Sequence, residues 1–116
     1  MDELTNFYKL LSDETRLRIL MLLKQKPLCV CQLYGIMGES QPKISKHLGK
    51  LRDMGIIQSI RKEQFTYYSL KTDNVLYLET LNNIFEKVDN YPVLKKDFYK
   101  INDAESFLNS QIEKEV

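Results

Sequence analysis

The sequence predicts a mainly α-helical domain that carries one β-hairpin. Gly and Pro together supply only seven of the 116 residues, so the chain contains few residues that break helices. Apolar residues recur at helical spacings of three and four along most of the chain, and this period changes only between Ile57 and Leu70. With 43% apolar residues, the chain can bury a single modest core.

The first half of the chain predicts four helices. A short one is expected from Asp2 to Leu11, and Ser12-Asp13-Glu14 provides the cap and early acidic residues of a second. This second helix is apolar on most of its circumference and is expected to be the central buried one. Residues 29–37 predict a third helix, and Ser40 caps a fourth that ends at Gly55.

The second half of the chain begins with a predicted hairpin. Ile57–Arg61 and Phe65–Leu70 are β-rich runs joined by the polar stretch Lys62-Glu63-Gln64. Helical spacing returns from Val75 to Val88, and one or two short helices are expected after Pro92. Two helices joined by a tight turn and followed by a hairpin make a winged helix-turn-helix.

The basic residues gather in the middle third of the chain. The net charge is +1 overall, but residues 41–70 carry +4 and residues 71–116 carry −3. A solvated charge run is the ordinary interpretation of such a stretch, but its position on the second helix of the pair and on the hairpin indicates DNA as the partner. The basic residues are Lys43, Lys46, Lys50, Arg52, Arg61 and Lys62.

Three segments resemble the ArsR/SmtB family of bacterial and archaeal repressors. Leu11–Leu20, with the sequence LSDETRLRIL, is similar to the opening of that family. Ser40–Leu48, with the sequence SQPKISKHL, resembles its recognition-helix signature, and Tyr68-Ser69-Leu70 resembles the end of its wing. The matches run in order through residues 11–70. The resemblance implies a homodimeric repressor that binds double-stranded operator DNA.

Polar residues of the predicted recognition helix are left exposed because its apolar residues face inward. Gln41 can pair bidentately with adenine, and Lys43 can reach guanine or phosphate. Three residues carry a second interpretation: Ser40 as a helix cap, His47 as a structural hydrogen-bonding residue, and Glu63 as a weakness in the wing's contact with phosphate. The candidate DNA-binding residues are Ser40, Gln41, Lys43, Ser45, Lys46, His47, Lys50, Arg61 and Lys62.

The pair Cys29-Val30-Cys31 stands at the start of the helix that supports the recognition helix, where it resembles the inducer site of the arsenic-sensing branch of the family. Two thiolates favour soft ions such as As(III) or Sb(III). Residues two apart on a helix point about 200° apart. With bonds of about 2.3 Å, one ion holding both sulfurs is therefore expected to unwind the first turn and release DNA. DNA binding itself needs no cofactor.

The position three residues after Cys31 distinguishes this chain from some arsenic sensors, which carry a third cysteine there. Here it is Tyr34, whose phenol is a poor substitute. As(III) or Sb(III) is then held by two protein sulfurs and one exogenous ligand, unless subunits share a site. A methylated As(III), which needs only two thiolates, is a further candidate inducer. The alternative is that both cysteines are small buried hydrophobes.

A dimer is expected because helix-turn-helix proteins read two half-sites with matched two-fold symmetry. Residues 1–90 are expected to form the DNA-binding and dimerisation domain, and residues 91–116 a C-terminal helical extension. The candidate interface consists of apolar residues from the first helix and from the stretch after the hairpin: Phe7, Leu11, Val75, Leu78, Leu81, Phe85 and Val88.

Other classes of function have less support in the sequence. One His, no Gly-rich phosphate loop and no zinc-hydrolase motif argue against an enzyme. The longest apolar run, Ile19 to Leu23, cannot span a bilayer, and the acidic start is unlike a signal peptide, so a cytoplasmic protein is expected. Two alternatives remain. One is a thiol redox-responsive repressor, although a Cys-x-Cys disulfide is strained. The other is a winged-helix interaction or metal-carrier module that does not bind DNA.

Overall fold

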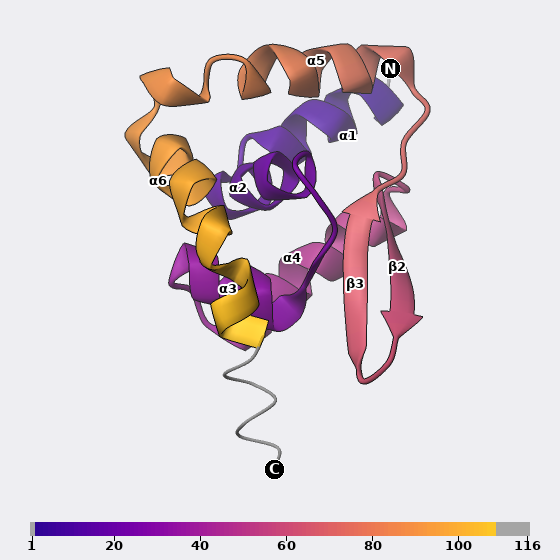
Figure 1. The fold of residues 1–116 in the computed structure, drawn as a ribbon. Coiled ribbons are helices and arrows are strands. Elements are labelled where there is room, and N and C mark those ends of the chain that lie inside the picture. Colours follow the sequence, from indigo (N-terminus) through magenta and orange to yellow (C-terminus); the bar gives the residue numbers. More distant parts are fainter. Residues whose placement is uncertain (1, 109–116) are drawn as a thin grey trace.

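The computed structural model describes residues 2–108 and confirms the winged helix-turn-helix (Figure 1). None of the helices in this range is long and apolar enough to cross a membrane. A helical segment at 104–108 follows the last named element. The elements are α1 (Asp2–Leu11), α2 (Glu14–Leu23), β1 (Leu28–Cys29), α3 (Val30–Met37), α4 (Gln41–Asp53), β2 (Ile57–Lys62), β3 (Phe65–Leu70), α5 (Val75–Phe85), η1 (Val88–Asn90), α6 (Pro92–Lys100) and η2 (Ile101–Asp103).

Local residues set the starts of α2 and α4 and the turn between α3 and α4. Asp13 caps α2, since its carboxylate accepts a hydrogen bond from the Arg16 backbone amide at 3.0 Å. Ser40 caps α4 by accepting from the Lys43 amide at 3.4 Å, which confirms its interpretation as a cap. Between α3 and α4 the chain turns at Gly38, whose φ of 68° lies in the left-handed region that favours glycine.

The hairpin is part of a small antiparallel sheet with the order β1-β3-β2. Strands β2 and β3 pair from Ile57 opposite Leu70 to Lys62 opposite Phe65, which leaves a two-residue turn. Strand β1 was not predicted, because two residues show no period and are extended only through their partner β3. The predicted helix at 29–37 therefore begins one residue later, at Val30.

Helix α2 is the central buried helix, as predicted. Its residues Ile19 and Leu20 have no exposed surface. Helix α4 packs on α2 and α3 through Ile44, Leu48 and Leu51, which are at most 1% exposed. Because these three residues share one face, the opposite face of α4 is left for solvent. The core thus fixes which side of the recognition helix a partner can reach.

The segment after η1 packs against the helix-turn-helix. Helix α6 contacts α2 and α3, and Leu94, Ile101 and Ala104 join the same hydrophobic core. In Figure 1 this segment, orange to yellow, descends on the side away from the hairpin and ends beside α3. The predicted extension at 91–116 is therefore helical over the part that the structure describes, and residues 109–116 lie outside it.

Candidate DNA-binding surface and thiol site

The exposed face of α4 carries the predicted base-reading residues. Gln41, Lys43, Lys46 and Lys50 are exposed, and Ser45 is half-buried. The side-chain amide of Gln41 donates to the Ser45 hydroxyl at 2.9 Å, so these two groups are held together near the start of the helix. A recognition helix contacts base edges with its N-terminal residues, and this pair occupies that position.

Lys43 is engaged by a carboxylate that sequence reasoning did not single out. Its ammonium lies 3.1 Å from Glu39, four residues before it. Glu39 also lies 3.6 Å from Arg18 on α2, and Arg18 forms a further ion pair with Asp97 on α6. The spacing of four between Glu39 and Lys43 was a readable signal for the first contact. The contacts of Arg18 with Glu39 and with Asp97 join residues that are far apart in the sequence, so no local spacing predicts them.

His47 on α4 lies against Arg16 of α2. Its Nδ1 lies 3.4 Å from Nη1 of Arg16, and Arg16 also donates through Nε to the Leu10 carbonyl at 3.0 Å. Burial lowers the pKa of His47, opposed by the Asp13 carboxylate and reinforced by the Arg16 charge. The imidazole is therefore mostly neutral at pH 7. This geometry supports the structural interpretation of His47 over a phosphate contact.

The hairpin tip presents two cations and one anion. Arg61 and Lys62 are exposed on β2, and the guanidinium of Arg61 donates to the Thr66 hydroxyl at 3.4 Å. Glu63 follows them in the turn, with a φ of 59° that is uncommon for a residue with a side chain. The tip therefore offers a net positive charge, reduced by one carboxylate.

The two cysteines meet at the junction of β1 and α3. Cys29 is the last residue of β1 and the extended N-cap of α3, with φ −87° and ψ 170°, and Cys31 lies in the first helical turn. Their sulfurs are 2.7 Å apart in a thiol hydrogen bond. The expected opposition of about 200° was wrong, because Cys29 is not helical. One ion with bonds of about 2.3 Å reaches both sulfurs without unwinding the turn.

Buried contacts hold this junction in place. Cys29 is 1% exposed and Cys31 is 8% exposed. The Cys29 amide donates to the side-chain oxygen of Gln32 at 3.0 Å, and the Gln32 side-chain nitrogen donates to the Ala104 carbonyl at 3.2 Å. Burial raises the pKa of Cys31 to about 12, with the hydrogen bond to Cys29 adding to the effect. Gln32, three residues after the cap, is a position that a capping pattern could have identified.

The matched family model is that of the bacterial regulatory proteins of the arsR family, and it covers residues 13–59. The transcriptional repressor SdpR of Bacillus subtilis is 37% identical over 90 residues, which cover 75% of this chain and 98% of that protein. The chain belongs to the ArsR family. Its relatives regulate transcription and are not enzymes.

Two relatives of this ArsR-family protein carry arsenic in their names. The arsenic resistance transcriptional regulator ArsR1 of Pseudomonas putida is 47% identical over 64 residues, 54% of this chain and 50% of that protein. The arsenical resistance operon repressor of Escherichia coli is 44% identical over 64 residues, 54% of this chain and 55% of that protein. The chain thus spans about half the length of these two relatives.

Solved structures of the ArsR fold superpose on the chain. The transcriptional repressor BigR from Xylella fastidiosa matches with a TM-score of 0.65 at 28% identity, over 73% of this chain and 85% of that one. The antimony-specific transcriptional repressor AntR matches with a TM-score of 0.64 at 26% identity, over 77% and 79% of the two chains. These matches support the overall fold of the chain, and the family model over residues 13–59 spans α3 and α4.

The predicted dimer interface of this ArsR-family protein contains buried, exposed and half-buried residues. Phe7, Leu81 and Val88 are buried inside the protomer, and the Phe7 ring stacks on Tyr77 with centroids 3.9 Å apart. These three fill the core, so they have almost no surface left for a partner. Val75 is 65% exposed and available. The other members are half-buried, namely Leu11, Leu78 and Phe85.

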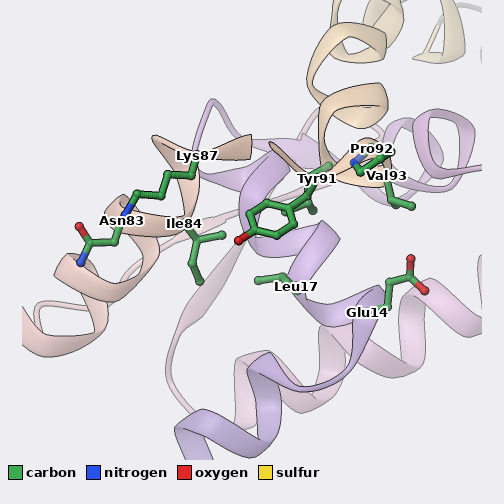
Figure 2. Close-up of a pocket in the computed structure, with 9 residues that line it drawn as sticks. Glu14, Leu17, Asn83, Ile84, Lys87, Tyr91, Pro92 and Val93 are labelled. Carbon is green, nitrogen blue, oxygen red and sulfur yellow. The ribbon is translucent and has the colours of Figure 1, made fainter. Parts of the chain in front are cut away.

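A cavity of about 580 Å³ lies away from both the thiols and the recognition helix. It is bounded by α2, α5 and the start of α6, and Figure 2 shows the Tyr91 ring over Leu17 and beside Ile84. None of the residues that line it is a cysteine or belongs to α3 or α4. A smaller cavity of about 370 Å³ opens beside Cys29 and Cys31.

Proposed function

We propose that this protein is a homodimeric repressor whose α4 and hairpin bind operator DNA, and which dissociates when a trivalent arsenic or antimony ligand binds Cys29 and Cys31. The observation that carries the proposal is the adjacency of the two sulfurs, 2.7 Å apart at the base of the helix pair. Residues 1–90 supply the DNA-binding and dimerisation unit, and residues 91–116 form the extension. The names of the arsenic-resistance relatives support the choice of ligand.

The position of the cysteines supports coupling between ligand and DNA. Cys29 pairs with Tyr67 in the hairpin strand β3, and Cys31 lies in α3, which packs on α4. A ligand bonded to both sulfurs replaces the present thiol–thiol hydrogen bond and fixes two elements relative to each other. Gln32 ties this junction to Ala104, and the hairpin and the recognition helix contact it as well. Any change in their relative position alters the surface offered to DNA.

The thiol pair has the chemistry that a soft, trivalent ligand needs. Thiolate sulfur favours soft ions over Mg²⁺ or Ca²⁺. Between residues 2 and 108, the structure shows no group of three or more His, Cys, Asp or Glu side chains that could hold a metal ion. When a neutral As(III) or Sb(III) hydroxide binds, each thiol proton combines with a hydroxide that leaves the arsenic or antimony, and the two depart as water. The raised pKa of Cys31 therefore opposes this ligand less than it opposes a divalent cation.

Replacing either cysteine tests the proposal. Cys29→Ser and Cys31→Ser should leave operator affinity nearly intact, because neither residue lies on the exposed face of α4. Release by As(III) should be lost, because one thiol cannot chelate. In the wild type, a coupling of about 1–3 kcal/mol corresponds to roughly 5–150-fold weaker DNA binding at saturating ligand. Fluorescence anisotropy of labelled operator DNA under reducing conditions measures both quantities.

The outcome that contradicts the proposal is release of DNA from Cys29→Ser by arsenite at wild-type concentrations. The cysteines are then buried hydrophobes. Release by peroxide alone favours the redox alternative. The structure disfavours that alternative, because the thiolate is the form that reacts with peroxide and burial raises the pKa of the Cys31 thiol. A gel shift that finds no DNA binding at all favours the interaction module.

Base reading by α4 gives a separate expectation. Gln41→Ala should reduce discrimination at one base pair of each half-site by about 1–3 kcal/mol, because a bidentate amide contact to adenine is lost. Affinity for unrelated DNA should change little. Competition binding with a set of operators, each carrying one changed base pair, measures the effect. A loss that is uniform across all sequences contradicts a base-reading role for Gln41.

A further inference from the structure

The last part of the chain that the structure describes lies against α3 (Figure 1). Residues 101–108, which we call the strap, consist of η2 and the helical segment at 104–108. Ile101 and Ala104 are buried in the hydrophobic core, and Phe107 packs against that core. Ala104 and Phe107 are three residues apart, so both lie on one face of the helical segment.

Gly35 allows the strap to approach α3 closely. A Cβ atom at this position would overlap Cγ and Cδ1 of the Phe107 ring, so the ring can lie there only because residue 35 has no side chain. Gln32 lies three residues earlier on the same face of α3, and its side-chain nitrogen donates to the Ala104 carbonyl at 3.2 Å. Two contacts therefore fix the strap on α3: Phe107 on Gly35, and Ala104 on Gln32.

Gln32 joins the strap to the thiol pair. Its side chain is buried, at 3% exposure, and its oxygen accepts a hydrogen bond from the Cys29 amide at 3.0 Å. One buried amide group thus bonds the N-cap of α3 with its oxygen and the strap with its nitrogen. Leaving either atom unpaired is costly, so Gln32 transmits a movement of Cys29 to the strap.

We propose that the strap holds α3 in the position from which α4 binds DNA, and that Gln32 releases the strap when a ligand bonds Cys29 and Cys31. The hold on α3 concerns DNA binding alone, because α3 packs on α4 and a shift of α3 moves the recognition helix. The release through Gln32 rests on the proposed function, from which it takes the ligand of the thiol pair.

The geometry of a bound ligand supplies the movement. Two bonds of about 2.3 Å that meet at about a right angle on a trivalent centre hold their sulfurs about 3.3 Å apart. The sulfurs of Cys29 and Cys31 are 2.7 Å apart, so binding has to spread them. Cys29 pairs with Tyr67 of β3 and bonds Gln32 through its amide. A displacement of Cys29 therefore strains the hydrogen bond between Gln32 and Ala104.

Substitutions on both sides of one contact test the hold on α3. Phe107→Ala removes the ring and Gly35→Ala displaces it, and each should weaken operator binding by about 5-fold, the lower end of the usual range for allosteric coupling. The double variant should also lose about 5-fold and not the product of the two losses, because the added methyl group has space once the ring is gone. Fluorescence anisotropy of labelled operator DNA measures the affinities, and circular dichroism checks that each variant is folded.

Ser106→Ala is the matched control, since Ser106 is the exposed neighbour of Phe107. It should keep the wild-type affinity. Operator affinities of Phe107→Ala and Gly35→Ala that both equal the wild-type value overturn the hold on α3. Losses that multiply in the double variant overturn it as well, because the two residues then act independently.

Hydrogen exchange tests the release through Gln32. Saturating arsenite should raise the exchange rate of the strap amides in the wild type by about 5-fold, because their protection depends on the contacts with α3. Gln32→Met keeps the length of the side chain but removes both hydrogen bonds. Its strap should exchange faster before arsenite is added, and arsenite should add nothing further. Cys31→Ser treated with arsenite is the control and should show the slow exchange of the ligand-free wild type.

The possible failures point to different conclusions. If arsenite releases DNA from the wild type while exchange in the strap stays unchanged, the release through Gln32 is overturned and the proposed function stands. If arsenite releases no DNA, the proposed function fails and the release through Gln32 fails with it. The hold on α3 is then still decided by the operator affinities of Phe107→Ala, Gly35→Ala and their double variant.

Discussion

Raising the salt concentration from 50 to 200 mM should weaken operator binding by about 10³–10⁵-fold. Three to five phosphate contacts per subunit give about 6–10 in a dimer, and each one releases a condensed counterion from DNA. The structure supports this number, because all six basic residues of the middle third are exposed, on α4 and at the hairpin tip. They are Lys43, Lys46, Lys50, Arg52, Arg61 and Lys62.

Replacing single basic residues tests whether this salt dependence comes from the exposed face of α4 and the hairpin tip. Lys50→Ala removes two contacts from a dimer and should lower the slope of log affinity against log salt by about 2. Lys95→Ala is the matched control, since Lys95 is an exposed lysine on α6. It should leave the slope unchanged. A slope near zero for the wild type contradicts DNA binding through these residues.

Lys43 should contribute less to this slope than Lys50. Its ammonium already lies 3.1 Å from Glu39, so a phosphate must compete with a carboxylate for it. Lys50 is also exposed on α4, and no ion pair within residues 2–108 involves it. Salt titrations of Lys43→Ala and Lys50→Ala measure this difference. Lys43→Ala should lower the slope of log affinity against log salt by less than Lys50→Ala does.

Local patterns in the sequence were sufficient for most of the fold. Helical spacing and caps gave α1, α2 and α4, and a change of period gave the hairpin, because these signals lie within a few neighbouring residues. The thiol geometry shows the limit of such reasoning. Cys29 lies one residue outside α3, and that single residue turns an expected opposition of the sulfurs into direct contact. A sequence pattern places the ends of a helix less precisely than its middle. Here the first residue of α3 determines whether the two sulfurs point apart or lie in contact.

Apolar periodicity could not separate core from interface. Phe7 and Leu81 have the helical spacing that we used to predict interface residues, yet they have no exposed surface in the protomer. Both environments remove apolar area from water, so both select the same residue types. The contacts of α6 were hidden for a different reason. Arg18 and Asp97 lie 79 residues apart, and no local pattern joins them.

Asp97→Ala should lower the free energy of unfolding by about 3 kcal/mol, the lower end of the range for breaking a buried ion pair. Asp97 is 2% exposed and binds Arg18 through both oxygens, at 2.7 Å to Nε and 2.9 Å to Nη2. This contact raises the pKa of Arg18. The guanidinium stays charged even after the carboxylate is removed, because arginine is not deprotonated in proteins. The lower end applies because Glu39 lies within 3.6 Å of Arg18 and partly compensates its charge.

Urea unfolding followed by circular dichroism, at one fixed protein concentration, measures this loss. Asp103→Ala is the control, since Asp103 is exposed and its removal should change the free energy by less than about 0.5 kcal/mol. The double variant Arg18→Met/Asp97→Leu should recover most of the loss, because it replaces the pair with apolar side chains and leaves no buried charge alone. If Asp97→Ala and Asp103→Ala unfold at the same urea concentration, the pair contributes nothing to holding α6 on α2. Arg18 also donates to the Met37 carbonyl at the end of α3, so the same loss should loosen the turn that leads into α4.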